Sequence, residues 1–346
     1  MKILALETSC DETAAAVVED GRRILSNVVS TQIDIHAPYG GVVPELASRH
    51  HIESLCPVVE KAMADAGLDF PDLGAVAVTQ GPGLVGSLLV GVQAAKAIAF
   101  VHDKPLVPVH HIAGHIQAPF LDPGGIPLPA LALVVSGGHT SLFLVPEEGS
   151  YRRLGRTRDD AAGEAFDKVA KLLGLGYPGG PVIDRLARGA DDAAIEFTVA
   201  RIKDGSLDFS FSGIKTAVLY HVRREGIPPV SDPAHVPEVV RDLLASFQRG
   251  VVTALVRGLV RAAEVHSPRS LVVTGGVAAN SRLRQEATRA AETLGLPVFI
   301  PPIALSTDNA AMIGAAGFVN FRRGIRAGFD LDAEPHLPLG QETGPS

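Results

Sequence analysis

The chain has 346 residues, of which 46% are hydrophobic and 20% are charged, and its net charge is −7 at pH 7. This length allows about two domains, and the presence of only two cysteines, Cys10 and Cys56, excludes a disulfide framework and a cysteine-rich zinc site. The acidic balance gives no overall attraction to nucleic acid, so contact with RNA requires a local basic surface or a helper subunit.

The distribution of apolar residues along the chain does not suggest a membrane protein. The segment Met1–Cys10 holds too few apolar residues for a signal-peptide core. No apolar run approaches the ~18 residues that a membrane span requires. We therefore expect a cytoplasmic protein with no membrane association.

The first part of the chain predicts alternating strands and helices. A helix follows Pro44, and Pro57 should kink it or break it in two. A hairpin is closed by Asp20-Gly21. The expected strands are Lys2–Glu7, Ala15–Val18, Ile24–Val29, Ala75–Val78 and Leu106–Val109, and an apolar helix runs from the Gly-rich turn after Ala75–Val78 to about Val101.

The pattern restarts near Pro129. A strand over Ala130–Val135, a tight turn and a strand over Ser141–Val145 repeat the opening, and a last strand begins at Leu271. The expected helices are Asp160–Leu173, Val182–Arg188, Ile214–Arg224, Pro237–Glu264 and Ser281–Leu294. This repetition predicts a duplicated α/β unit with ligands between its halves. We expect one lobe over 1–128, a second with helical insertions over 129–328, and a tail over 329–346.

Three Gly-rich turns follow buried strands. Gly81–Gly86 fits the dinucleotide fingerprint G-x-G-x-x-G, but Pro82 removes a backbone donor, and we interpret the segment as a packing turn. In Ser136–Thr140 and Gly275–Asn280, adjacent glycines allow N–H groups to point at an anion. Each is equally compatible with a plain turn. The chain contains no G-x-x-x-x-G-K-[ST], which excludes a P-loop NTPase.

His111 and His115 are four residues apart, a spacing that places both imidazoles on one helical face within reach of one metal ion. The alternative is two polar residues that begin a helix. Ile112 stands where a metalloprotease has glutamate, so the pair indicates metal binding and not proteolysis.

Two acidic positions are ambiguous. Asp184, after the rigid turn Tyr177–Pro181, is either a ligand for ribose hydroxyls or a surface acid on a helix. Asp11 and Glu12, after the first strand, are either a turn or cap pair or an acidic pair that faces phosphate and metal.

Nine segments stand together in the order of one family. They are Glu7–Thr13, Tyr39–Arg49, Gly81–Leu88, His110–His115, Val135–Thr140, Ala161–Pro181, Phe209–Val218, Gly275–Arg284 and Ser306–Gly314. From Met1 to about Asn320 the chain resembles the bacterial tRNA N6-adenosine threonylcarbamoyltransferases (TsaD), a branch of the actin/hexokinase-like superfamily. The resemblance implies an α/β fold of two duplicated actin/hexokinase-like (RNase H-like) lobes with an interlobe nucleotide site.

The implied reaction moves the threonylcarbamoyl group of threonylcarbamoyl-adenylate to N6 of the adenosine adjacent to the anticodon in ANN-decoding tRNAs. One metal ion, iron or zinc, would be held by His111, His115 and Asp308. The implied substrate contacts are Val134, Val135, Ser136, Gly137, Gly138, Asp167, Gly180, Asp184 and Asn280. We assign Asp11 or Glu12 as the group that takes the proton from the attacking amine. Ala113 stands where the family often has glutamate, and we expect it to affect only the surroundings of the metal ligands.

The resemblance also implies partners, namely a TsaB-like paralogue and a small TsaE-like ATPase. The helix after Pro44, with Leu46, Ile52, Leu55, Val58 and Val59, is the expected docking element, although core packing accounts for part of that stripe. Two other functions stay open. An actin-like ATPase or sugar kinase would share the fold but has no use for the histidine pair. A non-catalytic subunit would lack the metal residues.

Overall fold

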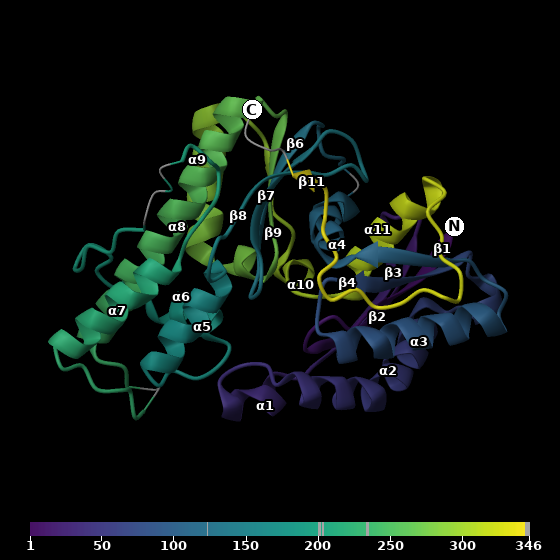
Figure 1. Cartoon of the computed structure of the whole chain (residues 1–346), viewed down its shortest axis with the longest axis horizontal. Coiled ribbons are helices and arrows are strands. Elements are labelled where there is room, and N and C mark those ends of the chain that lie inside the picture. The colour runs from purple at the N-terminus through teal and green to yellow at the C-terminus, as the bar shows by residue number, and fades with distance from the viewer. Residues whose placement is uncertain (123, 200–201, 203, 233–234, 343–346) are drawn as a thin grey trace.

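The computed structural model describes residues 1–122, 124–199, 202, 204–232 and 235–342, which form two α/β lobes (Figure 1). The first sheet contains β1 (Lys2–Glu7), β2 (Glu12–Glu19), β3 (Arg23–Thr31), β4 (Ala75–Gly81) and β5 (Leu106–His110). The second contains β6 (Ala130–Val135), β7 (Thr140–Val145), β8 (Arg152–Arg156), β9 (Ser270–Thr274), β10 (Val298–Phe299) and β11 (Gln341–Glu342).

Both sheets have the same topology. In the first, with order β3-β2-β1-β4-β5, the central strand β1 is antiparallel to β2 and parallel to β4. In the second sheet, β6 is antiparallel to β7 and parallel to β9. Written from the other edge, its order β8-β7-β6-β9-β10 matches β3-β2-β1-β4-β5 strand by strand, and β11 is added beside β8. The duplicated α/β unit expected from the sequence is therefore confirmed.

The helices of the first lobe cover both faces of its sheet. They are α1 (Ile33–His36), α2 (Pro44–Ala66), α3 (Val85–Val101), α4 (His111–Gln117) and, from the end of the chain, α11 (Ala310–Arg322). Leu4 and Leu6 of β1 pack towards α2 and α3, whereas Ile3 and Ala5 pack towards α11. Because both faces are covered, β1 is apolar at nearly every position instead of alternating.

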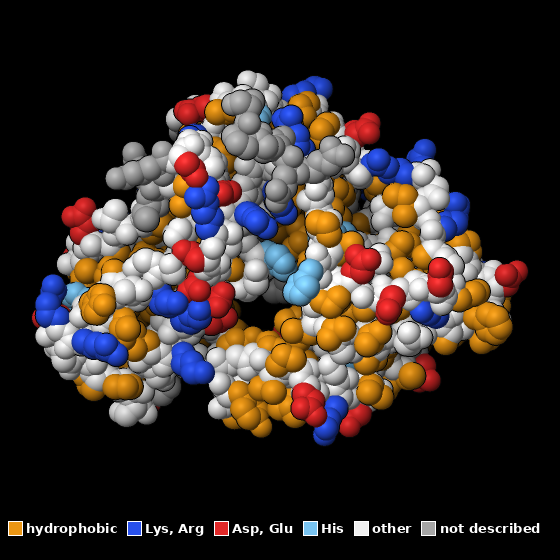
Figure 2. Space-filling view, in the orientation of Figure 1, with side chains coloured by type: hydrophobic (Ala, Val, Ile, Leu, Met, Phe, Trp, Pro, Cys, Tyr) orange, Lys and Arg blue, Asp and Glu red, His pale blue; other side chains and the backbone are white. Residues whose placement is uncertain are grey.

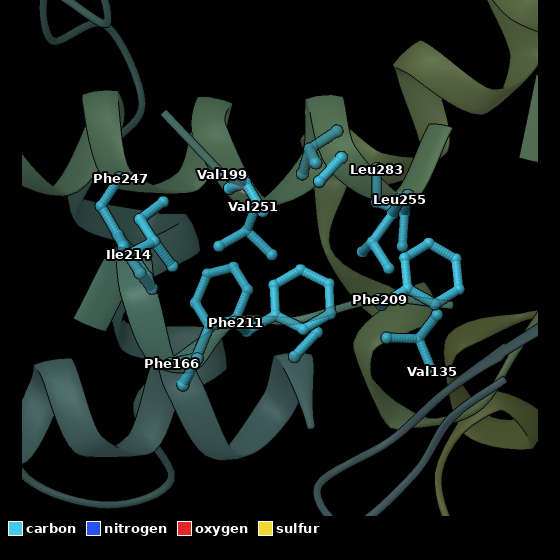
Figure 3. Packing of buried hydrophobic residues seen from close by; sticks show 14 of the residues in the cluster. Val135, Phe166, Val199, Phe209, Phe211, Ile214, Phe247, Val251, Leu255 and Leu283 are labelled. Carbon is cyan, nitrogen blue, oxygen red and sulfur yellow. The ribbon is translucent and has the colours of Figure 1, made fainter. Parts of the chain in front are cut away.

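The helices of the second lobe are α5 (Ala162–Leu172), α6 (Gly179–Leu186), α7 (Ser212–Arg224), α8 (Glu238–His266), α9 (Ser281–Leu294) and α10 (Ile303–Ser306). Figure 3 shows the aromatic part of its core, where Phe211 lies among residues of α5, α7 and α8. The rings of Phe166 and Phe247 meet edge to face, with centroids 5.2 Å apart. The other face of the sheet is covered by Ile112 and Ile116 of α4. Helix α4 therefore lies between the two sheets.

Helix α8 is the one helix of the described residues that is long and apolar enough to span a membrane by length and composition. In its most apolar window 61% of the residues are buried inside the second lobe. Its apolar composition is thus used in the core of the protein.

Most predicted elements are confirmed, including β1, the hairpin β2–β3, α3 and α9. The break at Pro57 is wrong, because α2 is one helix of 23 residues. Proline has no backbone N–H, so Pro57 leaves the carbonyl oxygen of Glu53 without its helical hydrogen bond. Both residues lie on the exposed side of α2, where water can bond to that oxygen. The division at 1–128, 129–328 and 329–346 stays a prediction, although α11, from the second of these segments, packs on the first sheet (Figure 1).

Candidate metal and catalytic site

Helix α4 carries both predicted metal-binding histidines into the region between the lobes. It begins directly after β5, where His110 Nδ1 accepts a hydrogen bond of 3.1 Å from the backbone N–H of Ile112. His111 and His115 then follow one turn apart, both buried, with ring centroids separated by 4.8 Å. The shared helical face predicted from their spacing is confirmed.

Glu7, the last residue of β1, holds the His111 ring in one orientation. Its fully buried Oε2 accepts hydrogen bonds from His111 Nδ1 at 2.9 Å and from Thr79 Oγ1 at 2.8 Å. Ser9 Oγ lies 3.1 Å from the same nitrogen. Because an ionised carboxylate can only accept, Nδ1 carries a proton, and Nε2 is left to face Asp308. This is the tautomer that an imidazole needs to bind a metal through Nε2.

Asp308 completes a three-residue cluster. Its Oδ1 lies 3.1 Å from His115 Nε2 and 3.6 Å from His111 Nε2, and one ligand atom from each residue lies within 4.8 Å of the others. Ligands of a tetrahedral ion with bonds of about 2.1 Å are about 3.4 Å apart, so a small inward movement brings all three onto one ion. His115 Nδ1 is buried with no hydrogen-bond partner among the described residues, and Nε2 has only its contact with Asp308, which lacks hydrogen-bond geometry. The cluster therefore fits a divalent metal ion.

The position of Asp308 depends on the close packing of α11 against α4. A Cβ atom on Gly114 would lie 2.8 Å from Ile313 Cδ1 and 3.3 Å from Met312 Cγ, so a larger residue there would require these side chains of α11 to move. Asn309 begins α11 by accepting a hydrogen bond of 3.1 Å from the N–H of Met312. Asp308, the preceding residue, is thereby placed against the histidines.

The charges of this cluster depend on one another. Burial lowers the pKa of His111, but the carboxylates of Asp308 and Glu7 outweigh burial and raise that pKa to about 9. Burial opposes ionisation of Asp308 and Glu7, yet the charge of His111 holds the pKa of each carboxyl below its usual range. A proton on His111 and a metal ion therefore compete for the same place.

Carboxyl groups of both lobes converge on the opening between them. Asp11 lies on the turn from β1 to β2, and Glu12 begins β2. Burial and the charges of Asp308 and Asp11 raise the pKa of Glu12 well above its usual range. Across the opening, burial, with a contribution from Asp11, raises the pKa of Asp167 to about 6. Figure 2 shows this opening, with histidine side chains at its upper rim and acidic side chains on its left.

The turn after β6 is open to this region. A Cβ atom on Gly137 or Gly138 would meet nothing within 4 Å, and both residues are exposed. Within the described part of the chain, neither backbone N–H has a hydrogen-bond partner. Val134 and Val135 differ, because their side chains are buried in the two cores of the second lobe. Of the expected phosphate loop, Gly137 and Gly138 are thus the part that can face an anion, whereas Ser136 is buried and its N–H donates to the carbonyl oxygen of His139 at 2.8 Å.

The other expected nucleoside contacts already have partners in the protein. Asp167 Oδ1 accepts from the N–H of Gly179 at 2.7 Å, next to the open position of Gly180. Asp184 Oδ1 accepts from the N–H and the hydroxyl of Ser281 at 3.1 and 2.6 Å. Asn280 Oδ1 accepts from the N–H of Leu283, which begins α9, and its Nδ2 donates to Gln248 at 2.8 Å. Asp167 thus joins α5 to the start of α6, and Asp184 joins α6 to the start of α9.

The turn Gly81–Gly86 is packed on both sides, as its interpretation as a packing turn predicts. A Cβ atom on Gly81 would lie 1.9 Å from the carbonyl oxygen of Glu334, and one on Gly83 would lie 2.5 Å from that of Ser9. Such contacts leave no space for a pyrophosphate at these glycines, which contradicts a dinucleotide loop.

The sequence did not single out Glu7, Ser9 and Thr79, which hold His111, nor His139. Burial lowers the pKa of His139 to about 4, and the neighbouring His111 and His115 act in the same direction, so its ring lies near the cluster. A signal for Glu7 exists, because a carboxylate that ends an otherwise apolar central strand requires a buried partner.

Comparisons with known proteins agree with this geometry. Residues 23–315 match the family model described as "TsaD: tRNA N6-adenosine threonylcarbamoyltransferase". A protein of that name from Anaeromyxobacter dehalogenans (strain 2CP-1 / ATCC BAA-258) is 61% identical over 335 residues, which is 96% of this chain and 98% of the relative. One from Moorella thermoacetica is 54% identical over 341 residues, covering 97% of each.

Solved structures with low sequence identity share the fold. HypF from T. kodakarensis has a TM-score of 0.62 at 14% identity, over 93% of this chain and 48% of that one. The component A of the Acidaminococcus fermentans (R)-2-hydroxyglutaryl-CoA dehydratase has a TM-score of 0.52 at 15% identity, over 92% and 98% of the two chains.

Proposed function

Because the chain belongs to the tRNA N6-adenosine threonylcarbamoyltransferase family, it is a transferase that acts on adenosine of tRNA, and we propose that the reaction takes place in the opening between its lobes. The observation that carries this proposal is the convergence of Asp308 with His111 and His115, in a protein whose turn after β6 exposes Gly137 and Gly138. The donor is threonylcarbamoyl-adenylate, and the acceptor is the adenosine adjacent to the anticodon in ANN-decoding tRNAs.

The transfer forms one bond and breaks another. The N6 amine of adenosine attacks the carbamoyl carbonyl carbon, the bond from that carbon to the phosphate oxygen breaks, and AMP leaves. The proton of the amine passes to a carboxylate. Of the two candidates we favour Asp11, because burial and the neighbouring carboxylates raise the pKa of Glu12 and so disfavour the ionised form that would take up the proton. Exposed N–H groups of Gly137 and Gly138 would stabilise the charge on the departing phosphate.

His111, His115 and Asp308 would hold the metal ion, which is iron or zinc. Such an ion acts as a Lewis acid and stabilises negative charge on donor oxygens. Asp167, Gly180, Asp184 and Asn280 would orient the adenylate. The bonds that these side chains make within the protein fix their orientation before the donor binds, which lowers the entropy cost of its binding.

A second protein is proposed as partner. Of the apolar stripe of α2, Leu55, Val58 and Val59 are buried in the first lobe, and Ile52 is 66% exposed. Val85 at the start of α3 is 55% exposed. We propose that this face binds a TsaB-like paralogue and that a TsaE-like ATPase joins the complex in the cytoplasm. Gel filtration with the paralogue tests the first step, and Ile52→Asp and Val85→Asp should abolish co-elution.

The charge distribution supports the need for a partner in tRNA binding. Residues 1–128 contain 7 Lys and Arg against 14 Asp and Glu, whereas 129–346 contain 24 of each, so the net charge of −7 lies in the first segment. Filter binding of tRNA across a salt series should show weak binding by the isolated chain. Tight, salt-sensitive binding without partners would contradict this view.

The decisive experiment for the function is a product analysis. Purified protein and partners are incubated with ANN-decoding tRNA and threonylcarbamoyl-adenylate, and the tRNA nucleosides are identified by mass spectrometry. Threonylcarbamoyl-adenosine should appear with the wild type and be lost with Asp308→Asn. Steady hydrolysis of ATP or phosphorylation of a sugar, without modified adenosine, would favour the kinase alternative.

A further inference from the structure

Four polar side chains lie fully buried behind the turn that carries Asp11 and Glu12. They are Thr13 of β2, Gln32, His36 of α1 and His51 of α2, each with no exposed surface. Their hydrogen bonds go to one another and to the backbone, and not to His111, His115 or Asp308. Buried polar groups are costly unless they are hydrogen-bonded, so their partners indicate what they support.

His51 bonds to the chain on both sides of the acid pair. Its Nε2 lies 2.9 Å from the carbonyl oxygen of Cys10, and its Nδ1 lies 2.7 Å from Thr13 Oγ1. A carbonyl oxygen can only accept, so Nε2 carries the proton and Nδ1 accepts from the hydroxyl of Thr13. Burial lowers the pKa of His51, which keeps the ring in this singly protonated form.

Gln32 and His36 also help to hold the turn before β2. The backbone N–H of Gln32 donates to the carbonyl oxygen of Asp11 at 3.1 Å. Gln32 Oε1 accepts from His36 Nε2 at 3.2 Å, and His36 Nδ1 accepts from the N–H of Val43 at 3.3 Å. The turn is thus fixed at Cys10, Asp11 and Thr13, and each histidine has a single tautomer that satisfies its partners.

We propose that His51 is a positioning residue for the reaction. It fixes the turn from Cys10 to Thr13, so that the carboxyl groups of Asp11 and Glu12 are held towards the interlobe opening, and it touches neither substrate nor metal. This inference rests on the proposed role of the acid pair in proton transfer. A displacement of the order of 1 Å of a reacting group lowers a rate by about 10²-fold.

Four variants test the proposal in the complete transfer reaction. His51→Leu removes both bonds, His51→Gln keeps a donor for the Cys10 carbonyl, and His50→Gln is the matched control. His50 is the neighbouring residue of α2, and its Nδ1 lies 3.1 Å from Ser54 Oγ of the same helix. The readouts are kcat, KM for tRNA, bound metal and thermal unfolding. Thr13→Val removes one bond only and supplies a milder perturbation if His51→Leu folds poorly.

A positioning role predicts a fall in kcat of about 10²-fold for His51→Leu, with KM for tRNA and metal content within about twofold of the wild type. His51→Gln should regain at least about tenfold of that loss, and His50→Gln should match the wild type. Thr13→Val should lower kcat about tenfold. A wild-type kcat in His51→Leu, or an equal loss in His51→Gln, overturns the proposal.

A double-mutant cycle separates positioning from general loss of structure. If His51 acts through the acid pair, His51→Leu has no further effect on kcat once Asp11→Asn and Glu12→Gln are present. Multiplicative losses reject the inference and leave the proposed function intact. Full activity of the Asp11→Asn, Glu12→Gln protein rejects the inference and the assignment of the proton acceptor, and leaves the transfer reaction itself intact. A wild-type protein without transfer activity rejects the proposed function, and the inference with it.

Discussion

Replacing Glu7 with Gln should weaken metal binding without removing any ligand. The substitution keeps the size of the side chain and removes its charge. In the wild type, Glu7 Oε2 accepts from His111 Nδ1 and Thr79 Oγ1, and Oε1 accepts from the N–H of Ser9. A glutamine has one acceptor oxygen for these donors. If the NH₂ group of the glutamine faces Ser9, it opposes the backbone N–H of Ser9, which is also a donor. If it faces His111, then His111 Nδ1 must accept, and the proton moves to Nε2, where the metal would bind.

The size of the effect follows from this conflict. An unsatisfied buried donor costs about 1–3 kcal/mol, and loss of a partner to a metal-bound histidine lowers metal affinity about 10- to 100-fold. The two figures agree, because each tenfold change in affinity corresponds to about 1.4 kcal/mol. We expect Glu7→Gln to raise the Kd for the metal within this range.

The measurement is a competition titration of the metal-free protein with Zn²⁺ against a chelator of known affinity, together with the metal content at saturation. Asp184→Asn is the matched control, since it makes the same chemical change at a buried carboxylate that bonds to Ser281 and Arg188. It should bind metal as the wild type does. If Glu7→Gln binds Zn²⁺ within about twofold of the wild type, the reasoning from the His111 tautomer is wrong.

Four further predictions concern the metal ligands and the cap of α9. Both His111→Ala and His115→Ala should lose bound metal. His111→Ala should unfold at the lower temperature, because it removes the positive partner of the buried Glu7 carboxylate at a cost of about 3–5 kcal/mol. Equal melting temperatures of the two variants would contradict this. Metal affinity should increase with pH up to about 9, because the metal displaces the His111 proton. Metal titrations at several pH values should show this increase and a plateau above about pH 9. An affinity that does not change with pH would exclude competition between proton and metal. In the metal-free protein the same proton stabilises the fold at acidic and neutral pH, and this contribution should be lost as pH rises through about 9, which denaturant unfolding can measure. Asn280→Ala should lower stability by about 1 kcal/mol through loss of the α9 cap, and Asn280→Asp, which keeps the cap oxygen, should retain most of it.

Local features of the fold could be read from the sequence because they depend on neighbouring residues. The apolar run of β1, the Asp20-Gly21 turn and the four-residue spacing of His111 and His115 each specify a local conformation. Asp20 and Gly21 adopt φ angles of 52° and 67°, the left-handed values that such a hairpin turn requires. The third metal ligand, Asp308, was predicted only from the family resemblance, because no spacing within a local segment links it to the two histidines.

Other features were decided by packing between distant segments. Strand β8, with Arg152, Arg153 and Arg156, has no apolar alternation and forms because β7 offers its edge. Helix α2 continues through Pro57 because its buried side holds Leu55, Val58 and Val59 against the first sheet. Tertiary contact is thus strong enough to override a local helix breaker.

The candidate site shows the same division. Sequence spacing placed His111 and His115 on one face, but the partners that fix their chemistry come from β1, from β4 and from the segment before α11. Those partners meet because β1 lies between β2 and β4 and because Gly114 lets α11 approach α4. Strand order and helix packing are properties of the whole chain, since they depend on which buried surfaces fit together and not on periodicity within a segment.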